Sequence, residues 1–187
     1  KILLDLISKY DVTPEMLMQR LTNLLPKHFG IDQLFFLRMR GNVKEETFEM
    51  TKELHLSRLH NPYANALQEH YCRRWLAISI MKDVYQKNSQ KKYRHPIVSA
   101  QISQYWQTHN RYLCITIAKP QSKTSDKVIS VTLGLLIDRE LQQRVPFVND
   151  LNIQVRNVHT TCERCGISDC KERAARPSVI EIQDEQN

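Results

Sequence analysis

Two segments that alternate apolar and polar residues, 111–119 and 127–137, place the strongest constraint on the fold of this chain. In each segment the apolar side chains recur at every second position, which puts them on one face of a β-strand. They are Leu113, Ile115 and Ile117 in the first segment, and Ile129, Val131, Leu133, Leu135 and Ile137 in the second. The polar connector 120–126 has hairpin length. We therefore predict an antiparallel hairpin with one continuous apolar face.

A second hairpin is indicated by residues 34–40 and 47–56. The first segment is rich in aromatic and aliphatic residues and ends at a Gly-Asn turn signal. In the second, Phe48, Met50 and Leu54 alternate with polar residues, as in a half-buried partner strand. Residues 47–56 could also be drawn as a helix, so this alternative stays open here.

Helical spacing marks other parts of the chain. Residues 2–9 and 14–28 repeat apolar residues every three or four positions, and the second segment is bounded by Thr13 as N-cap and Gly30 as C-terminal stop. The same spacing predicts a long helix over 63–86, with a polar loop from its end to residue 95. Further predicted elements are a short helix from Asp138 to Arg144, a strand over 151–158 with Leu151, Ile153 and Val155 as its apolar residues, and a polar tail from residue 183.

The resulting order is helices, hairpin, long helix, hairpin, short helix and strand. It predicts an α+β fold in which an antiparallel sheet is covered by helices, the arrangement of small sensor domains of the GAF or PAS type. We divide the chain into an N-terminal helical pair (1–30), a GAF-like sensor core (31–158), and a cysteine knuckle with the C-terminal tail (159–187).

Composition points to a soluble, cytoplasmic protein. The 187 residues are 41% hydrophobic, with a mean hydropathy of −0.49. No apolar run approaches the roughly 20 residues that a membrane-spanning helix needs. A net charge of +7 favours association with nucleic acid or acidic ligands but does not by itself establish a partner of either kind. The chain begins inside a predicted helix and without Met, so we expect it to be part of a longer protein.

Three of the five cysteines are spaced as Cys162-x2-Cys165-x4-Cys170, which points to a metal site in a cytosolic protein. Structural zinc is bound by four ligands in tetrahedral geometry, so these three cysteines need a fourth ligand. Cys72 is the first candidate because it would join the long helix to the C-terminal segment. His159 is the local alternative and His70 a third.

Other readings of these cysteines stay open. Three cysteines with one distant partner also suit an iron–sulfur cluster. They could instead be free thiols, with the Cys-x-x-Cys pair forming a disulfide only on oxidation. Cys114 lies inside a predicted strand and is interpreted as a small buried residue.

Catalytic motifs are absent from the sequence. It contains no HExxH, no G-x-S-x-G, no Walker A motif and no G-x-G-x-x-G, so we expect a protein that is not an enzyme. Aromatic and basic residues in the middle of the chain are candidates to line a pocket for an acidic ligand. The candidates are Tyr71, Arg73, Arg74 and Trp75.

Several stretches together resemble a known family. Residues 13–26 (TPEMLMQRLTNLLP), followed by 29–31 (FGI) and 34–38 (LFFLR), resemble the segment after the helix-turn-helix in long bacterial XRE-type regulators. These regulators are related to the ImmA/IrrE group and include the short-chain fatty acyl regulators. Residues 70–75 (HYCRRW) are similar to that family's Cys-x-x-Trp, and 162–177 (CERCGISDCKERAARP) to its terminal Cys-x-x-Cys…Cys…Arg-Ala-x-Pro.

The resemblance implies a regulatory role. Such regulators couple an N-terminal DNA-binding domain, absent here, to an effector-sensing domain that forms a homodimer. Members govern acetate, glyoxylate or propionate metabolism, with acyl-CoA thioesters as proposed effectors. Many relatives carry an HExxH metallopeptidase-like domain that this sequence lacks, so no protease role is carried over.

We therefore expect an effector that prefers one arrangement of the dimer and so changes its DNA affinity. Two rival readings are a zinc-dependent hydrolytic enzyme, with a water on the metal, and a purely structural zinc module for protein contacts.

Overall fold

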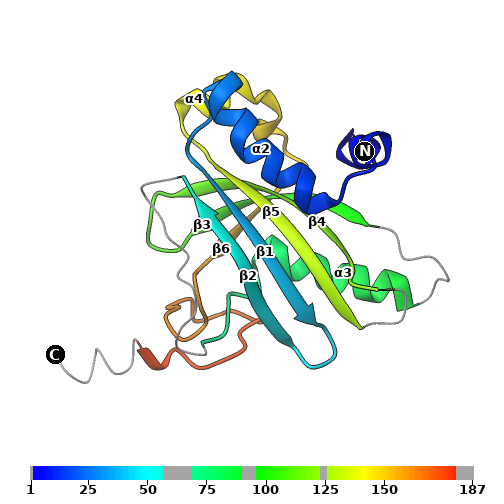
Figure 1. Cartoon of the computed structure of the whole chain (residues 1–187). Coiled ribbons are helices and arrows are strands. Elements are labelled where there is room, and N and C mark those ends of the chain that lie inside the picture. Colours follow the sequence, from blue (N-terminus) through cyan, green and yellow to red (C-terminus); the bar gives the residue numbers. More distant parts are fainter. Residues whose placement is uncertain (1, 57–68, 90–95, 123–125, 180–187) are drawn as a thin grey trace.

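The computed structural model describes residues 2–56, 69–89, 96–122 and 126–179 (Figure 1). Its helices are α1 (Ile2–Tyr10), α2 (Pro14–Phe29), α3 (Leu76–Ser89), α4 (Arg139–Arg144) and the 3-10 helix η1 (Pro146–Asn149). Its strands are β1 (Leu34–Asn42), β2 (Thr47–His55), β3 (Ile97–Tyr105), β4 (Arg111–Pro120), β5 (Lys127–Leu136) and β6 (Gln154–Val158). The strands form one sheet in the order β2-β1-β5-β4-β3-β6, antiparallel except for the parallel pair β3 and β6. The fold is α+β, as expected.

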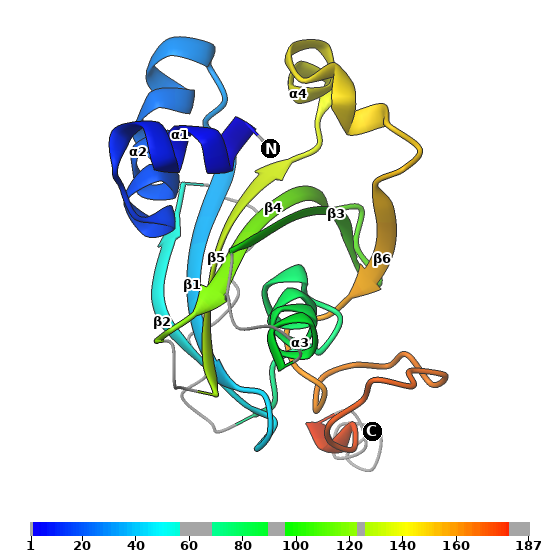
Figure 2. The same ribbon diagram turned by 90° about the vertical axis from the view of Figure 1, so that its right-hand side faces the viewer.

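Helices cover both faces of the sheet (Figure 2). On one face, α1, α2 and α4 pack against Leu113, Ile117, Val131 and other aliphatic residues of the central strands. On the other face lies α3, which contacts β3, β4 and β5. The predicted apolar face of the β4–β5 hairpin is confirmed except at Ile129, because its other aliphatic residues belong to or pack against the core beneath α1 and α2.

The β1–β2 hairpin is also confirmed, and the helical alternative for residues 47–56 is wrong. A β-bulge changes which residues of β2 face inward: Arg38 pairs with Lys52, but Met39 pairs with Met50, so β2 carries one extra residue. The extra residue shifts the alternation beyond it. Leu54 is therefore 42% exposed, against our prediction, and His55 lies on the α3 side beside Phe35.

The long helix predicted over 63–86 is wrong at its start, because α3 begins only at Leu76. Residues 69–75 are held by backbone bonds to the C-terminal segment, which include the isolated β-bridge between Tyr71 and Thr161. Residues 63–68 lie outside the described part of the chain. At its other end α3 runs on to Ser89, into the predicted loop, and residues 90–95 of that loop also lie outside.

Helix α2 begins and ends where its signals predict. The Thr13 hydroxyl accepts a hydrogen bond from the Met16 amide at 3.1 Å, and Gly30 ends α2 in the left-handed conformation at φ 63°. Asp138 caps α4 in the same manner, accepting from the Leu141 amide at 2.7 Å.

Strand β3 was not predicted, and β6 is shorter than expected. The predicted apolar residues of β6 are wrong in part, because Leu151 precedes the strand and is fully exposed. The polar tail from residue 183 lies outside the described residues. None of the described helices is long and apolar enough to cross a bilayer.

Candidate metal centre

Residues 69–75, which precede α3, lie beside the C-terminal cysteine segment (Figure 1). The Cys72 amide donates to the Thr160 carbonyl at 3.1 Å, and the Cys162 amide donates to the His70 carbonyl at 2.8 Å. These bonds flank the bridge between Tyr71 and Thr161 and together form a short antiparallel ladder. The C-terminal segment is therefore joined to the middle of the chain, as the hypothesis of a Cys72 partner requires.

Three thiols gather at this junction: those of Cys72, Cys162 and Cys165 are all buried. The Cys72 sulfur accepts from the His159 amide at 3.5 Å, and the Cys162 sulfur accepts from the Ala174 amide at 3.4 Å. Cys165 donates its amide to the Cys162 carbonyl at 3.2 Å, which closes the turn between them. Backbone N–H groups directed at sulfur favour the thiolate, the form that binds metals.

The electrostatics of the junction set the pKa of Cys72. Burial raises the pKa of this thiol to about 11, while the amides of His159 and Arg74 lower it. The nearby Cys162 and Cys165 raise the pKa further, because neighbouring thiolates repel each other. A thiolate at Cys72 therefore requires a nearby positive charge, such as a bound metal ion.

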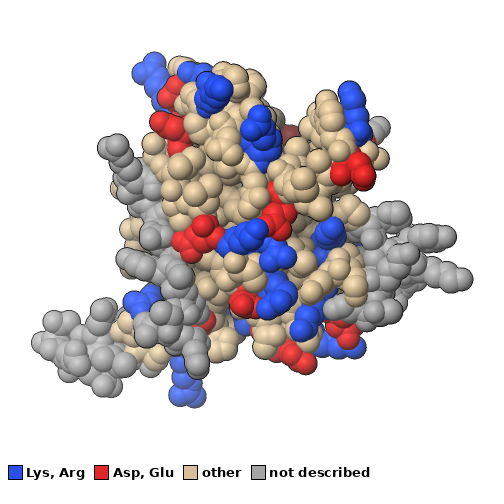
Figure 3. All heavy atoms as spheres, viewed as in Figure 1, with Lys and Arg blue, Asp and Glu red and all other residues tan. Residues whose placement is uncertain are grey.

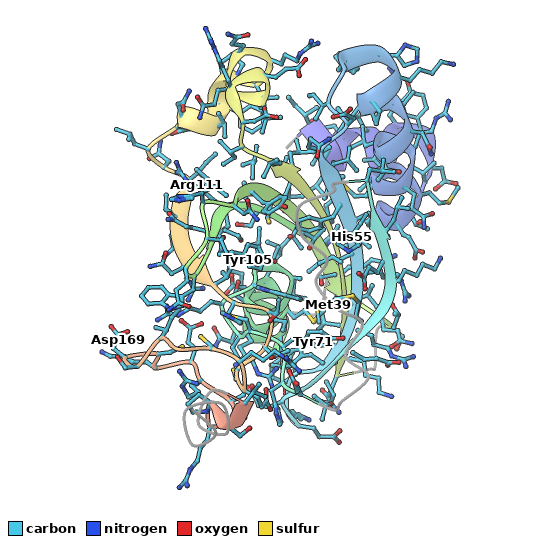
Figure 4. The ribbon with its side chains drawn as sticks, turned by 90° about the vertical axis from the view of Figure 1, so that its left-hand side faces the viewer. Met39, His55, Tyr71, Tyr105, Arg111 and Asp169 are labelled. Atoms are coloured by element: carbon cyan, nitrogen blue, oxygen red, sulfur yellow. The ribbon has the colours of Figure 1, made fainter. Side chains whose placement is uncertain are left out.

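A complete set of metal ligands is not apparent among the described side chains. Cys170 is only half-buried, and its neighbour Asp169 lies at the outer end of the loop, away from Tyr71 (Figure 4). The alternative ligand His159 places its ring Nδ1 3.1 Å from the Thr160 hydroxyl, and His70 places its Nδ1 2.7 Å from Glu163. Within the described ranges, no group of three or more His, Cys, Asp or Glu residues has an arrangement that could hold a metal ion. The buried thiols fit zinc by their chemistry, but the ligand set is not assembled.

Arg173 fixes the path of the cysteine loop, a role that sequence reasoning missed. Its guanidinium donates to the carbonyls of Cys162 and Cys165, each at 3.0 Å, and also to the carbonyl of Ile167. One side chain thus binds three backbone oxygens between the cysteines. The position of Arg173, three residues after Cys170, carries no sequence signal for this role.

Carboxylates near the cysteines are engaged by other groups. Glu69 binds the Arg164 guanidinium through two contacts, at 2.9 and 2.6 Å, and accepts from the Thr161 hydroxyl at 2.6 Å. The bond from Arg164 is the main reason that the pKa of Glu69 is lowered. Glu163 accepts from the His70 amide at 2.9 Å. These carboxylates hold the two segments together.

The predicted ligand-binding residues face this junction. The Trp75 indole donates to the His159 carbonyl at 2.7 Å, and its ring lies 5.5 Å from that of Tyr71. Arg74 donates to the Asn157 carbonyl at 3.4 Å. Arg73 is buried and donates to the carbonyls of Tyr71 and Glu46. That they bind an acidic effector stays a prediction.

Charged side chains of both signs mix on the face formed by α2, β1 and β2 (Figure 3). Glu15 contacts both Arg38 and Lys52, at 2.9 and 2.5 Å, and Arg40 pairs with Glu49 at 2.6 Å. The described residues of this face therefore form no continuous basic stripe of the kind that nucleic-acid binding favours.

Comparison with known proteins finds no matching family model, no matching curated protein and no matching solved structure.

Proposed function

We propose that this chain is the effector-sensing and dimerisation domain of a cytoplasmic bacterial transcriptional regulator, built on a GAF/PAS-like core. The observation that carries the proposal is an antiparallel sheet covered on both faces by helices and joined, at Tyr71 and Thr161, to a separate cysteine segment. A sheet between helices can enclose a small molecule. A segment that is joined to the sheet can transmit the resulting conformational change to another domain. DNA would be bound by a helix-turn-helix domain upstream.

The cysteine segment forms a knuckle with Cys72 when a metal is bound. Cys72, Cys162 and Cys165 would hold zinc, with Cys170 or His159 as the fourth ligand, and an iron–sulfur cluster is the alternative group. The bound metal supplies a cross-link between the middle and the end of the chain. The residues themselves orient the thiols through the amides of His159 and Ala174.

Burial of the thiols favours a structural centre over a catalytic one. Catalytic zinc keeps an open position for a water and a substrate, whereas these three sulfurs are shielded from solvent. A purely structural zinc module is therefore the second candidate function. Zinc-dependent hydrolysis would need an open, solvent-accessible metal position, which burial of these sulfurs does not favour. We therefore propose that the protein is not an enzyme.

Metal content in cysteine variants tests the centre. We expect the purified protein to carry stoichiometric zinc, or iron with sulfide after anaerobic preparation, and Cys72→Ser or Cys162→Ser to lose it. Cys114→Ser is the matched control, because Cys114 is buried within β4 and pairs with Gln101 and Gly134 in the sheet. A wild-type protein without metal, or equal metal in all variants, would contradict the proposed centre.

Effector binding is tested by thermal unfolding with acetyl-CoA, propionyl-CoA and free CoA. A ligand that binds the native state alone raises the apparent stability, by about 2.7 kcal/mol at 100 times its Kd. We expect the thioesters to raise the melting temperature more than CoA does. Folded protein that shows no shift with either thioester would exclude acyl-CoA as the effector.

Dimerisation is tested by sedimentation of the same protein. We expect a mass twice that of the chain, and a monomer across the micromolar range would contradict this part of the proposal.

A further inference from the structure

A hollow of about 230 Å³ lies at the end of the β1–β2 hairpin, on the face of the sheet that Figure 3 shows. Its lining includes Arg40 and Asn42 of β1, Thr47 and Glu49 of β2, and Lys127 at the start of β5. Paired residues of neighbouring strands point to the same side of a sheet, so these five side chains share one face. The hollow therefore collects polar side chains from three adjacent strands.

Helix α2 covers the same face but stops short of the hollow. Its first turn contacts the hairpin through Glu15, which pairs with Arg38 and Lys52 at 2.9 and 2.5 Å. Arg40 lies two residues further along β1, and its side chain is 42% exposed, against 21% for Arg38. The hollow is therefore open to solvent and accessible to a dissolved molecule.

The turn beside the hollow is held by its own contacts. The Asn42 side-chain oxygen accepts from the amides of Lys44 and Glu45, at 3.2 and 3.4 Å. The Lys44 ammonium pairs with Asp126 at 2.8 Å, which joins this turn to the connector between β4 and β5. A lining that is already held in place loses less conformational entropy when a ligand binds.

The charges of the lining are balanced. Arg40 and Lys127 are cationic, whereas Glu45 and Glu49 are anionic. Arg40 and Glu49 form an ion pair across the strands at 2.6 Å. A ligand with a single charge would meet as many like charges as opposite ones, which disfavours simple anions and simple cations alike. A zwitterion, with a carboxylate and an ammonium a few atoms apart, can satisfy charges of both signs.

The size and polarity of the hollow limit the rest of the ligand. Its volume is below the roughly 300–1,000 Å³ of pockets for drug-sized molecules. Phe48 is the one apolar residue among the described residues of the lining, and its ring packs toward the α3 side, where a Cβ added at Gly41 would lie 2.5 Å from it. A large apolar side chain would therefore find little to pack against.

We propose that this hollow binds a small zwitterion of the α-amino acid class, with its carboxylate toward Arg40 and Lys127 and its ammonium toward Glu45. The inference goes beyond the proposed function, since it requires neither a metal centre nor an acyl-CoA effector. The charges are exposed, so water weakens each contact, and we expect dissociation constants in the millimolar range.

Titration with L-alanine, followed through the backbone amide NMR signals of the full chain, tests the site. N-acetyl-L-alanine keeps only the carboxylate and L-alaninamide keeps only the ammonium, so the three compounds separate the two charges. We expect L-alanine to shift the signals of residues 40–49 and 127. We also expect it to bind about threefold more tightly than either analogue, the effect of one exposed ion pair. No saturable shift, shifts confined to other residues, or an analogue that binds as tightly as L-alanine would overturn the proposal.

Three variants test which side chain meets which charge. Glu45→Gln removes the partner of the ammonium, so L-alanine and N-acetyl-L-alanine should bind this variant equally. Lys127→Gln weakens the partner of the carboxylate, so the preference for L-alanine over L-alaninamide should narrow. Lys44→Gln is the matched control, because Lys44 belongs to the same turn but pairs with Asp126 outside the lining, and it should keep both preferences. Preferences that are unchanged in all three variants, or that change equally in all three, overturn the assignment.

Discussion

Glu53 and His55 are ionisable residues of β2 that lie on the α3 face of the sheet. The His55 Nε2 lies 2.7 Å from a Glu53 oxygen, and the ring lies 5.8 Å from that of Phe35. Both side chains are mostly buried, because the β2 bulge turns them toward the α3 side. Burial lowers the pKa of His55, and the attraction of Glu53 opposes this shift without cancelling it.

The pKa of His55 predicts a loss of stability in mild acid. Because the folded-state pKa lies below the value of about 6.5 for an unfolded imidazole, protonation favours the unfolded chain. The contribution of His55 is fully present above pH 6.5 or so and is lost as the pH falls toward the folded-state pKa. We expect His55→Gln to flatten the decline in unfolding free energy between about pH 7.5 and 5.5, measured with urea. An unchanged decline in the variant would contradict the assignment to His55.

At the scale of elements, the Phe35 ring of β1 lies directly over Gly134, its partner residue in β5. An added Cβ at Gly134 would lie 2.1 Å from the Phe35 ring, which is itself buried and packed against Tyr112. The missing side chain at Gly134 is what lets this ring lie against the neighbouring strand. Glycine is required here by space and not by backbone conformation.

Gly134→Ala should therefore destabilise the protein by about 1–3 kcal/mol through overpacking. Phe35→Leu in the same chain provides the control, because a smaller side chain makes room for the new methyl group. We expect the double variant to be more stable than the sum of the two single changes indicates, measured by denaturant unfolding. Additive effects would show that the ring is not what excludes a side chain at this position.

The start of α2 allows a second test at this scale. Thr13→Ala removes the hydroxyl that accepts from the Met16 amide, and we expect a loss of about 1 kcal/mol. Thr13→Ser keeps the oxygen and should retain most of the stability. Equal unfolding midpoints for the Ala and Ser variants would show that the cap contributes nothing to the folded state.

Elements fixed by local signals could be predicted, and those fixed by distant partners could not. Thr13 and Gly30 bound α2 within a few residues, and β4 and β5 carry their alternation in their own sequence. By contrast, β3 places the polar residues Ser99, Gln101 and Ser103 on the α3 side, so only its other face, which carries Val98 and Ile102, is apolar. Residues 69–75 have helical spacing but pair with the C-terminal segment. Tertiary hydrogen bonds there override the local preference.

At the scale of the whole molecule, the junction of residues 69–75 with 159–165 joins the end of the chain to the core under α3. Cys72 and Trp75 pack in that core together with Tyr105 and Val158. The sequence predicted that Cys72 would approach the later cysteines. The role of Arg173 depends on the three-dimensional path of the loop, which spacing does not encode.

The indole of Trp75 contributes directly to this junction, and the other tryptophan supplies a matched comparison. Trp75→Phe keeps an aromatic ring but removes the donor to the His159 carbonyl, and an unsatisfied buried carbonyl costs about 1–3 kcal/mol. The Trp106 indole N–H is buried and donates to no acceptor among the described residues, so Trp106→Phe loses no hydrogen bond of this kind. We expect Trp75→Phe alone to speed amide exchange in residues 159–165 and to lower the unfolding free energy more than Trp106→Phe does. If the two variants exchange equally in this segment, the Trp75 bond does not hold the C-terminal segment in place. The backbone ladder between Cys72, Thr160 and Cys162 and the contacts of Glu69 and Glu163 must then do so.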